Sequence, residues 1–184
     1  FMVVLDKGKN VLATFDMERT EEEYLYQLSH AGDIVDRIAA AKQLQHHNND
    51  TAVFEALRNA ALRDRFWTVR NQAVLSLATS DDSRVKGTLL EVYGDKHSSV
   101  RTSAITALSH FHSRDVADAV WNAALTDSSY LVLSSCIGVL AEIDSVRGFD
   151  LATRSVQMES YRNIIRRAAM HALLTLKDAR AIPF

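Results

Sequence analysis

Apolar residues recur along most of the chain at spacings of three, four and seven positions, which is the pattern of one buried face of an α-helix. In five places this pattern follows a shared template: an arginine, an alanine three positions later and a leucine seven positions later. The template begins at Arg37, Arg70, Arg101, Leu133 and Arg166. The fourth copy is degenerate, since it has leucine for the arginine and Cys136 for the alanine. The copies lie 33, 31, 32 and 33 residues apart, so the chain contains an internal repeat of nearly constant period.

A second amphipathic stretch precedes each copy of the template. These stretches cover residues 20–30, 51–62, 83–94, 114–125 and 146–158. Each repeat is therefore predicted to be a helical hairpin, with a first helix, a tight turn and a second helix that carries the template. One such hairpin cannot bury its own apolar faces, whereas stacked hairpins share a continuous core. The expected fold class is all-α, an α–α superhelix (solenoid) of about five helical hairpins.

The residues of the template have mechanical explanations. The small alanine keeps the second helix thin where the first helix crosses it, and the leucine fills the core between repeats. Three aspartates lie in the turns, six positions before the template begins, where a carboxylate can accept free amide protons at a helix start. We expect Arg70 and Arg101 to reach the turn aspartates of neighbouring repeats, because a guanidinium can donate two parallel hydrogen bonds to a carboxylate. The expected ladder comprises Arg37, Arg70, Arg101, Arg166, Asp64, Asp95 and Asp127.

The motif D-x4-V-R-x2-A-x3-L resembles HEAT repeats, and in particular the short HEAT-like repeats named for phycobilisome lyases. The resemblance covers about residues 20 to 176. It implies the solenoid fold. It says little about function, since HEAT arrays serve as adaptors, as lyase subunits and as accessory domains of enzymes.

Residues 1–19 have a different pattern. Two short β-rich runs, Val3 to Leu5 and Val11 to Phe15, flank a turn around Gly8 and together predict a β-hairpin. An isolated hairpin is marginal in water, so this one is expected to be the cut edge of a larger sheet, with the HEAT-like domain over 20–184. Because the chain opens on an apolar strand, we expect it to be a segment of a longer protein.

The opening of the chain, from Val3 to Leu44, also resembles the junction in M1-family zinc aminopeptidases where a small β-sandwich meets a carboxy-terminal helical domain. The matching features are the strand that ends at Asp6, the strand through Phe15, the acidic helix that follows and the first template copy. Where that family often has a proline after the aspartate, this chain has Lys7. The resemblance implies that the expected hairpin belongs to a preceding β-sandwich domain. It also implies a parent zinc metalloaminopeptidase, with its zinc on an HExxH helix located before the helical domain. No HExxH occurs in this sequence, so no zinc ligand or other cofactor contact is carried over to any residue here.

Composition and charge narrow the range of partners. With 47% apolar and 24% charged residues, one proline and six glycines, the chain fits a helical protein with short turns. A net charge of −2 argues against a nucleic-acid partner. The small basic cluster of Arg162, Arg166 and Arg167 is expected to be solvated or ion-paired. No stretch has the length and apolarity of a membrane helix, and the compartment, cytoplasm or periplasm, stays open.

Neither a catalytic nor a metal-binding residue is expected in this segment. The histidine pair His46 and His47 and the pair His110 and His112 belong to repeats one and three, which should lie roughly 20 Å apart. Zinc ligands must lie about 2 Å from the metal, so the two pairs cannot share one ion. No glycine-rich phosphate loop or GxSxG motif is present. Cys136 is expected to act as a small buried apolar residue.

The resemblance to M1 enzymes therefore implies a non-catalytic domain that encloses the active-site chamber. Its partners would be the preceding β-sandwich and catalytic domains of the same chain, together with peptide or protein. Contacts are expected from the solvent side of the second helices, on the concave face. The candidate contact residues are Asn71, Gln72, Thr102, Ser103, Ser134, Ser135 and Arg167. Two alternatives stay open: a free-standing adaptor that binds a partner protein, and a lyase-type subunit that handles a cofactor.

Overall fold

The structure is a computed structural model that describes residues 19–47, 50–80 and 82–177. It divides into two compact units, residues 1–81 and residues 82–184. In the described part of both units, every regular element is a helix and no strand occurs. The expected hairpin over residues 1–19 lies outside the described residues, which begin at Arg19.

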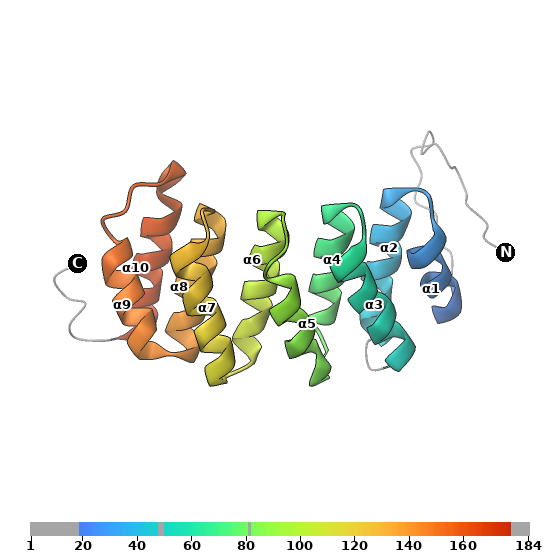
Figure 1. Ribbon diagram of the computed structural model, residues 1–184, viewed down its shortest axis with the longest axis horizontal. Coiled ribbons are helices and arrows are strands. Elements are labelled where there is room, and N and C mark those ends of the chain that lie inside the picture. Colours follow the sequence, from blue (N-terminus) through green and yellow to red (C-terminus); the bar gives the residue numbers. More distant parts are fainter. Residues whose placement is uncertain (1–18, 48–49, 81, 178–184) are drawn as a thin grey trace. The chain divides into compact units, whose positions relative to one another are not determined.

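Unit 1 contains two helical hairpins (Figure 1). Its elements are α1 (Glu21–His30), α2 (Ile34–Leu44), the short 3₁₀ helix η1 (Gln45–His47), α3 (Thr51–Arg63) and α4 (Trp67–Leu77). Within the hairpins, α1 packs against α2 and α3 against α4. Between the hairpins, first helix packs on first helix and second on second, so that α1 meets α3 and α2 meets α4. This is the expected stacking of repeats.

Unit 2 contains three hairpins in the same order. Its elements are α5 (Arg84–Val92), α6 (Ser98–Ala107), η2 (Leu108–His110), α7 (Arg114–Thr126), α8 (Tyr130–Ile143), α9 (Ser145–Ser155), η3 (Tyr161–Asn163) and α10 (Ile164–Leu176). The second helices form one layer, in which α8 packs against both α6 and α10. The hairpins of both units together bear out the α-solenoid predicted from the repeat.

The core consists of the template positions that the sequence selects. The alanine or cysteine three positions into each copy is completely buried, and so are the leucines of the first four copies; Leu173, in the fifth, is 6% exposed. The buried small residues are Ala40, Ala73, Ala104, Cys136 and Ala169, and the leucines are Leu44, Leu77, Leu108, Leu140 and Leu173. The predicted core face of the second helices is therefore confirmed.

Polar side chains fix where several helices begin. Thr20 and Glu23 form a capping box at α1, in which the Glu23 amide donates to Thr20 Oγ1 at 3.3 Å and the Thr20 amide donates to Glu23 Oε2 at 2.8 Å. Asp33 caps α2, since its carboxylate accepts a hydrogen bond from the Val35 amide at 2.7 Å. Ser129 occupies the same position before α8, but its side chain makes no capping hydrogen bond.

Gly148 allows α9 to approach α8 at backbone distance. A Cβ atom added to Gly148 would lie 2.6 Å from Ala141 Cα and 2.8 Å from the carbonyl carbon of Leu140. Both contacts are with backbone atoms at the end of α8, which cannot rotate away as a side chain would. The last two hairpins are therefore joined at a point where only glycine fits.

Candidate functional site

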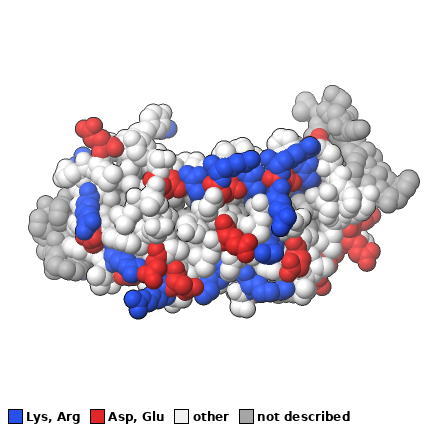
Figure 2. Space-filling view, viewed as in Figure 1, with Lys and Arg blue, Asp and Glu red and all other residues white. Residues whose placement is uncertain are grey.

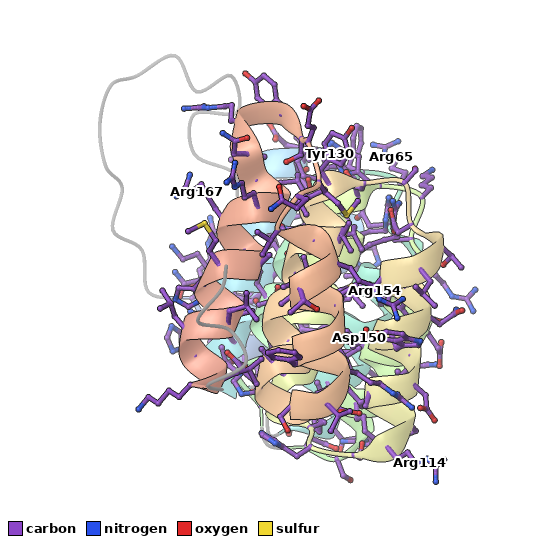
Figure 3. The ribbon with its side chains drawn as sticks, turned by 90° about the vertical axis from the view of Figure 1, so that its left-hand side faces the viewer. Arg65, Arg114, Tyr130, Asp150, Arg154 and Arg167 are labelled. Atoms are coloured by element: carbon purple, nitrogen blue, oxygen red, sulfur yellow. The ribbon has the colours of Figure 1, made fainter. Side chains whose placement is uncertain are left out.

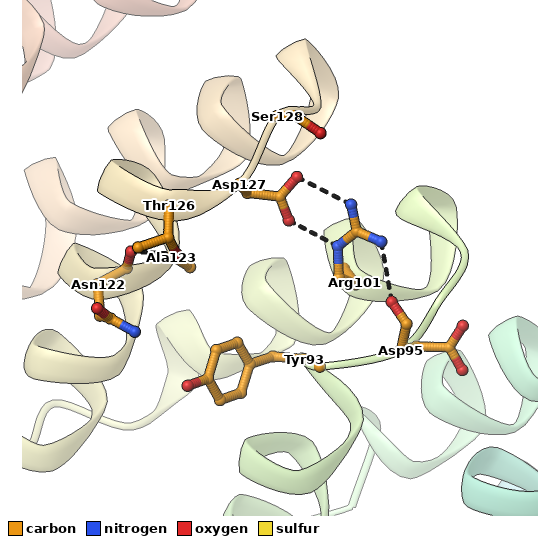
Figure 4. A pocket seen from close by; sticks show the side chains of 9 residues that line it. Tyr93, Asp95, Arg101, Asn122, Ala123, Thr126, Asp127 and Ser128 are labelled. Carbon is orange, nitrogen blue, oxygen red and sulfur yellow. Dashed lines mark hydrogen bonds and ion pairs between the residues drawn. The ribbon is translucent and has the colours of Figure 1, made fainter.

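Arg101 links two consecutive hairpins of unit 2 through three hydrogen bonds (Figure 4). Its Nε donates to Asp127 Oδ2 at 2.6 Å and its Nη2 donates to Asp127 Oδ1 at 2.8 Å. Its Nη1 donates to the backbone carbonyl of Asp95 at 2.9 Å, at the end of its own hairpin's turn. The guanidinium thus holds its own turn and the turn of the next hairpin at a fixed distance.

Arg37 makes the same set of contacts in unit 1. Its Nε and Nη2 donate to the two carboxylate oxygens of Asp64 at 2.8 and 3.2 Å, and its Nη1 donates to the Ala31 carbonyl at 2.9 Å. Arg70 likewise donates from Nη1 to the carbonyl of Asp64 at 2.9 Å. Arg70 and Asp95 belong to different units, so the expected contact between them stays a prediction.

The position of these arginines follows from helix electrostatics. The carbonyls of Ala31 and Asp64 terminate α1 and α3, where unpaired carbonyls carry partial negative charge. A cation at this end is favourable, and the carboxylate of the next turn neutralises it. The same carboxylates also organise the turn, since Asp64 accepts the Phe66 amide at 2.8 Å and Asp127 accepts the Ser129 amide at 2.8 Å.

The series of contacts stops between the fourth and fifth hairpins, and both partners change together. Leu133 replaces the arginine, and Ser160 stands where the next aspartate would be. Ser160 instead accepts a hydrogen bond from the Ile165 amide at 3.0 Å. Arg166, which was expected in the ladder, is exposed and makes no hydrogen bond or ion pair with any residue that the structure describes.

The α9–α10 connection, where the arginine–aspartate contact is missing, has an unusual backbone. The predicted helix over 146–158 ends at Ser155, and Arg162 and Asn163 then adopt left-handed conformations with φ of 53° and 56°. Asparagine tolerates this region, whereas for arginine it costs roughly 1 to 2 kcal/mol. Tyr161 stands 72% exposed beside them.

The seven predicted contact residues are divided between the units. Asn71 and Gln72 lie on α4 of unit 1 and are half-buried. The other five lie on the outer side of the second helices of unit 2. We call this surface the B face of unit 2, and its predicted members are Thr102, Ser103, Ser134, Ser135 and Arg167. Only Arg167 among these five is exposed, and the remaining four are half-buried.

Sequence reasoning missed the apolar side chains on this layer of helices. Leu131 on α8 is 44% exposed and Met170 on α10 is 47% exposed. A usable signal was present at Leu131: this leucine is three positions before Ser134 and four before Ser135, on the same side of α8 as two predicted contact residues. The second helices therefore present exposed apolar groups beside small hydroxyl groups.

Within the described residues of each unit, a hollow lies at the turn end of the hairpins. The hollow of unit 2 has a volume of 430 Å³ and lies beside Arg101 and Asp127, with Tyr93 and Asn122 in its wall (Figure 4). The hollow of unit 1 has a volume of 490 Å³ and lies beside Arg37. Each is lined by the ends of two consecutive first helices, so both follow from the repeat.

The contact between Arg101 and Asp127 shifts the protonation of both groups. Partial burial raises the pKa of Asp127, but hydrogen bonds from Arg101 and from the Ser129 amide outweigh it and hold that pKa below its ordinary value. The hydrogen bond to Asp127 raises the pKa of Arg101. The pair is therefore ionised at neutral pH.

Acid is expected to remove the stabilisation that Asp127 provides. Since its pKa is lower in the folded than in the unfolded chain, its contribution is complete above the ordinary value of about 4 and is lost as the pH falls through the lowered pKa. Chemical denaturation at a series of pH values should show the wild type losing its advantage over an Arg101→Leu/Asp127→Ser variant as the pH falls below about 4 and passes through the lowered pKa of Asp127. An advantage that does not change with pH would contradict this contribution.

Cys136 is buried in α8, and burial together with the negative charge of Asp127 raises the pKa of its thiol to about 12. Thiolate is the reactive form, so the folded protein should resist iodoacetamide at pH 8 and react once unfolded in urea. The measurement is the mass of the intact protein with time. Rapid labelling without urea would show that the thiol is accessible.

Charges on the surface are mixed, and the described residues contain no metal centre. On the face of each unit that Figure 2 shows, basic and acidic side chains are interspersed. Within residues 19–47, 50–80 and 82–177, no three His, Cys, Asp or Glu side chains come together as they would around a metal ion. The ring nitrogen Nδ1 of His47 lies 3.2 Å from Oε2 of Glu21, and no third such side chain in the described ranges lies beside them. No helix in this part of the chain is long and apolar enough to cross a membrane.

The family model for HEAT repeats matches residues 22–109 and 54–141. The chain belongs to the HEAT-repeat family. No curated protein sequence matches this HEAT-repeat chain. Among solved structures, it is similar to one described as "The structure of the complex of CpcE and CpcF of phycocyanin lyase from Nostoc sp. PCC7120". That match has a TM-score of 0.71 and 16% sequence identity, and it covers 94% of this chain and 71% of the other.

These findings correct one prediction from the sequence. The HEAT-repeat chain was expected to be the non-catalytic part of a zinc metalloaminopeptidase, on the basis of residues 3–44. The structure that it matches instead belongs to a lyase complex, and neither that match nor the family model connects it to an aminopeptidase. Two of the four matching features, the strands that end at Asp6 and pass through Phe15, lie in residues 1–18, outside the described part of the chain.

Proposed function

We propose that this HEAT-repeat protein is a scaffold that binds a partner protein along the B face of unit 2. The observation that carries the proposal is a contrast between the two layers of helices. In unit 2, ion pairs connect neighbouring hairpins on the first helices, whereas α6 and α8 carry hydroxyl and apolar side chains on their outer side, among them Thr106 and Leu131.

The ion pairs of the first helices connect neighbouring hairpins. Lys86 on α5 lies 2.9 Å from Asp115 on α7, and Arg147 on α9 lies 2.6 Å from Asp118 on α7. On α9, Asp150 and Arg154 form a further pair at 2.9 Å, and both point outward (Figure 3). Such a hydrated, charged surface is poorly suited to the core of an interface, which is depleted in charge.

The B face has the opposite character. On α6 it includes the half-buried Ser103 and the exposed Thr106, whereas the hydroxyl oxygen of Thr102 is buried, and on α8 Leu131 lies beside Ser134. Apart from Arg167, little charge has to be dehydrated when a partner covers such a surface, and the apolar groups gain by burial. A continuous face of stacked helices is also the surface that repeat proteins present to large partners.

A photo-crosslinking experiment tests this proposal. The crosslinking amino acid p-benzoylphenylalanine is placed at Ser135 on the B face or, as the control, at Arg114, which is exposed on α7. Illumination of the source cells should give a discrete adduct from Ser135 and none from Arg114, and Leu131→Glu should reduce its yield several-fold. Adducts of equal yield from both positions, or none from either, would refute binding through the B face.

A second function, that of a subunit in a lyase-type complex, is favoured by the structural similarity to the phycocyanin lyase complex. At 16% sequence identity this similarity shows a shared fold only, so lyase activity needs a test of its own. The chain is mixed with phycocyanin and with its separated subunits. Co-elution in gel filtration together with a change in the visible spectrum would support this function, and separate elution with an unchanged spectrum would exclude it.

A further inference from the structure

The α9–α10 connection and the first turn of α10 carry three arginines that have no partner among the residues described. Arg162, Arg166 and Arg167 are all exposed, and none makes an ion pair or hydrogen bond with a residue in the described part of the chain. The sequence predicts that such a cluster is solvated or ion-paired, and the ion-paired alternative does not occur among these residues. Glu159 is also exposed nearby and forms no ion pair with them. The local surface is therefore basic.

The position of two of these arginines works against helix stability. Arg166 and Arg167 are in the first turn of α10, where the helix dipole is positive and a cation is unfavourable. Elsewhere in unit 2, exposed arginines lie beside carboxylates, as Arg154 does beside Asp150. An arrangement that is unfavourable in the isolated protein becomes favourable when an anionic group covers it.

Exposed large side chains accompany the positive charge. Tyr161 is 72% exposed and Met158 is 42% exposed, and both belong to the connection itself. Figure 3 places the exposed Tyr130 at the same end of unit 2, while Arg167 points away from α9. Tyrosine, methionine and arginine are the residues enriched in protein interfaces, because they combine large contact area with directional hydrogen bonds or charge.

The backbone holds these side chains outward. Two consecutive residues, Arg162 and Asn163, have left-handed conformations, and this places Tyr161 and Arg162 in solvent instead of continuing the short turn seen in the other hairpins. Strained backbone of this kind is often kept at binding sites. The change coincides with the point where the arginine–aspartate contacts stop, at Leu133 and Ser160.

We propose that this surface, formed by Met158, Tyr161, Arg162, Arg166 and Arg167, binds an acidic segment of the partner protein. The proposal rests on the proposed function, since the segment belongs to the protein bound along the B face. Charge complementarity selects the occupant: three unpaired guanidinium groups and a helix N-terminus favour carboxylates, and the two large side chains favour apolar residues between them. A nucleic acid would match the positive charge, but it has no aliphatic side chains to pack against Met158 and Tyr161 between its anionic groups.

The test uses a fluorescein-labelled peptide of acidic residues interspersed with phenylalanine, and a counterpart with glutamine in place of each acidic residue. Fluorescence anisotropy with the full chain should show binding of the acidic peptide alone, and binding should weaken as salt rises because exposed charges are screened. R162Q/R166Q/R167Q should weaken binding by about tenfold or more. Tyr161→Ala should weaken it several-fold.

The matched control removes the same charge from unit 2 at Arg84, Arg114 and Arg154. These arginines are exposed and lie beside carboxylates, so R84Q/R114Q/R154Q should bind the peptide within about twofold of the wild type. Circular dichroism confirms that each variant is folded. Equal losses in both triple variants, or no binding by the wild type, would overturn the proposal. A single-stranded oligonucleotide that binds as tightly as the peptide would also overturn it.

These outcomes are separate from those of the proposed function. If crosslinking from Ser135 captures a partner and the arginine variant captures it equally well, the acidic segment is refuted and the B face stands. If the peptide binds through the arginines but Ser135 gives no adduct, the acidic-segment site at the α9–α10 connection is supported and partner binding along the B face is refuted.

Discussion

Arg101→Met is expected to lower the free energy of unfolding by about 3 to 5 kcal/mol. The side chains of Arg101 and Asp127 are only 18% and 10% exposed, so the variant would leave a carboxylate largely buried without its partner. It would also leave the Asp95 carbonyl without the hydrogen bond that it accepts at the end of the turn. Urea denaturation of the full chain gives the free energy of unfolding for both proteins.

The control for this variant is Arg114→Met. The side chain of Arg114 is 92% exposed and lies 4.0 Å from Asp118, so its removal should change stability by less than about 0.5 kcal/mol. Arg101→Leu combined with Asp127→Ser should recover part of the loss, because it copies the residues found at Leu133 and Ser160 and leaves no buried charge. If Arg101→Met and Arg114→Met were equally stable, the contact would have no structural importance.

Gly148→Ala is expected to destabilise the protein by about 3 kcal/mol, although alanine is the better helix former. The added Cβ would meet Ala141 Cα at 2.6 Å, which requires α9 to move away from α8. Overpacking of this kind costs about 1 to 3 kcal/mol, and it reaches the upper end when backbone atoms oppose the new group. Thermal and urea denaturation both report the loss.

The same substitution at Gly87 is the matched control. Gly87 is an exposed helical residue of α5, and an added Cβ there would meet nothing within 4 Å. Gly87→Ala should therefore stabilise the protein by about 0.5 to 1 kcal/mol through helix propensity alone. If both glycine variants changed stability in the same direction, the close approach of α9 to α8 would be wrong.

The sequence was informative wherever the repeat imposes the same demand on each hairpin. Ala104 and Leu108 were predicted to be buried because equivalent residues recur at the same step, and a recurring apolar position reports a recurring contact. The turn aspartate Asp127 could be noticed for the same reason. These predictions concern positions whose environment is copied from hairpin to hairpin.

Features that occur once could not be predicted in this way. A lone glycine in a helix, such as Gly148, indicates only weak helix propensity, because the neighbour that it touches is set by tertiary packing. The left-handed residue Arg162 follows from a connection that departs from the repeat, and arginine has no preference for that conformation. Tyr161 belongs to that connection, so its exposure could not be inferred from the periodicity of the helices.

The paired loss at Leu133 and Ser160 has a consequence for how this protein tolerates recombination. Each arginine–aspartate contact, or rung, takes its cation from one hairpin and its anion from the next. If segments are exchanged between homologous chains and the crossover falls between the two residues of a rung, one of the two charges can be left without its partner. The junction between the fourth and fifth hairpins has no rung to divide. Chimaeras joined there should express and fold more often than chimaeras joined between Arg101 and Asp127.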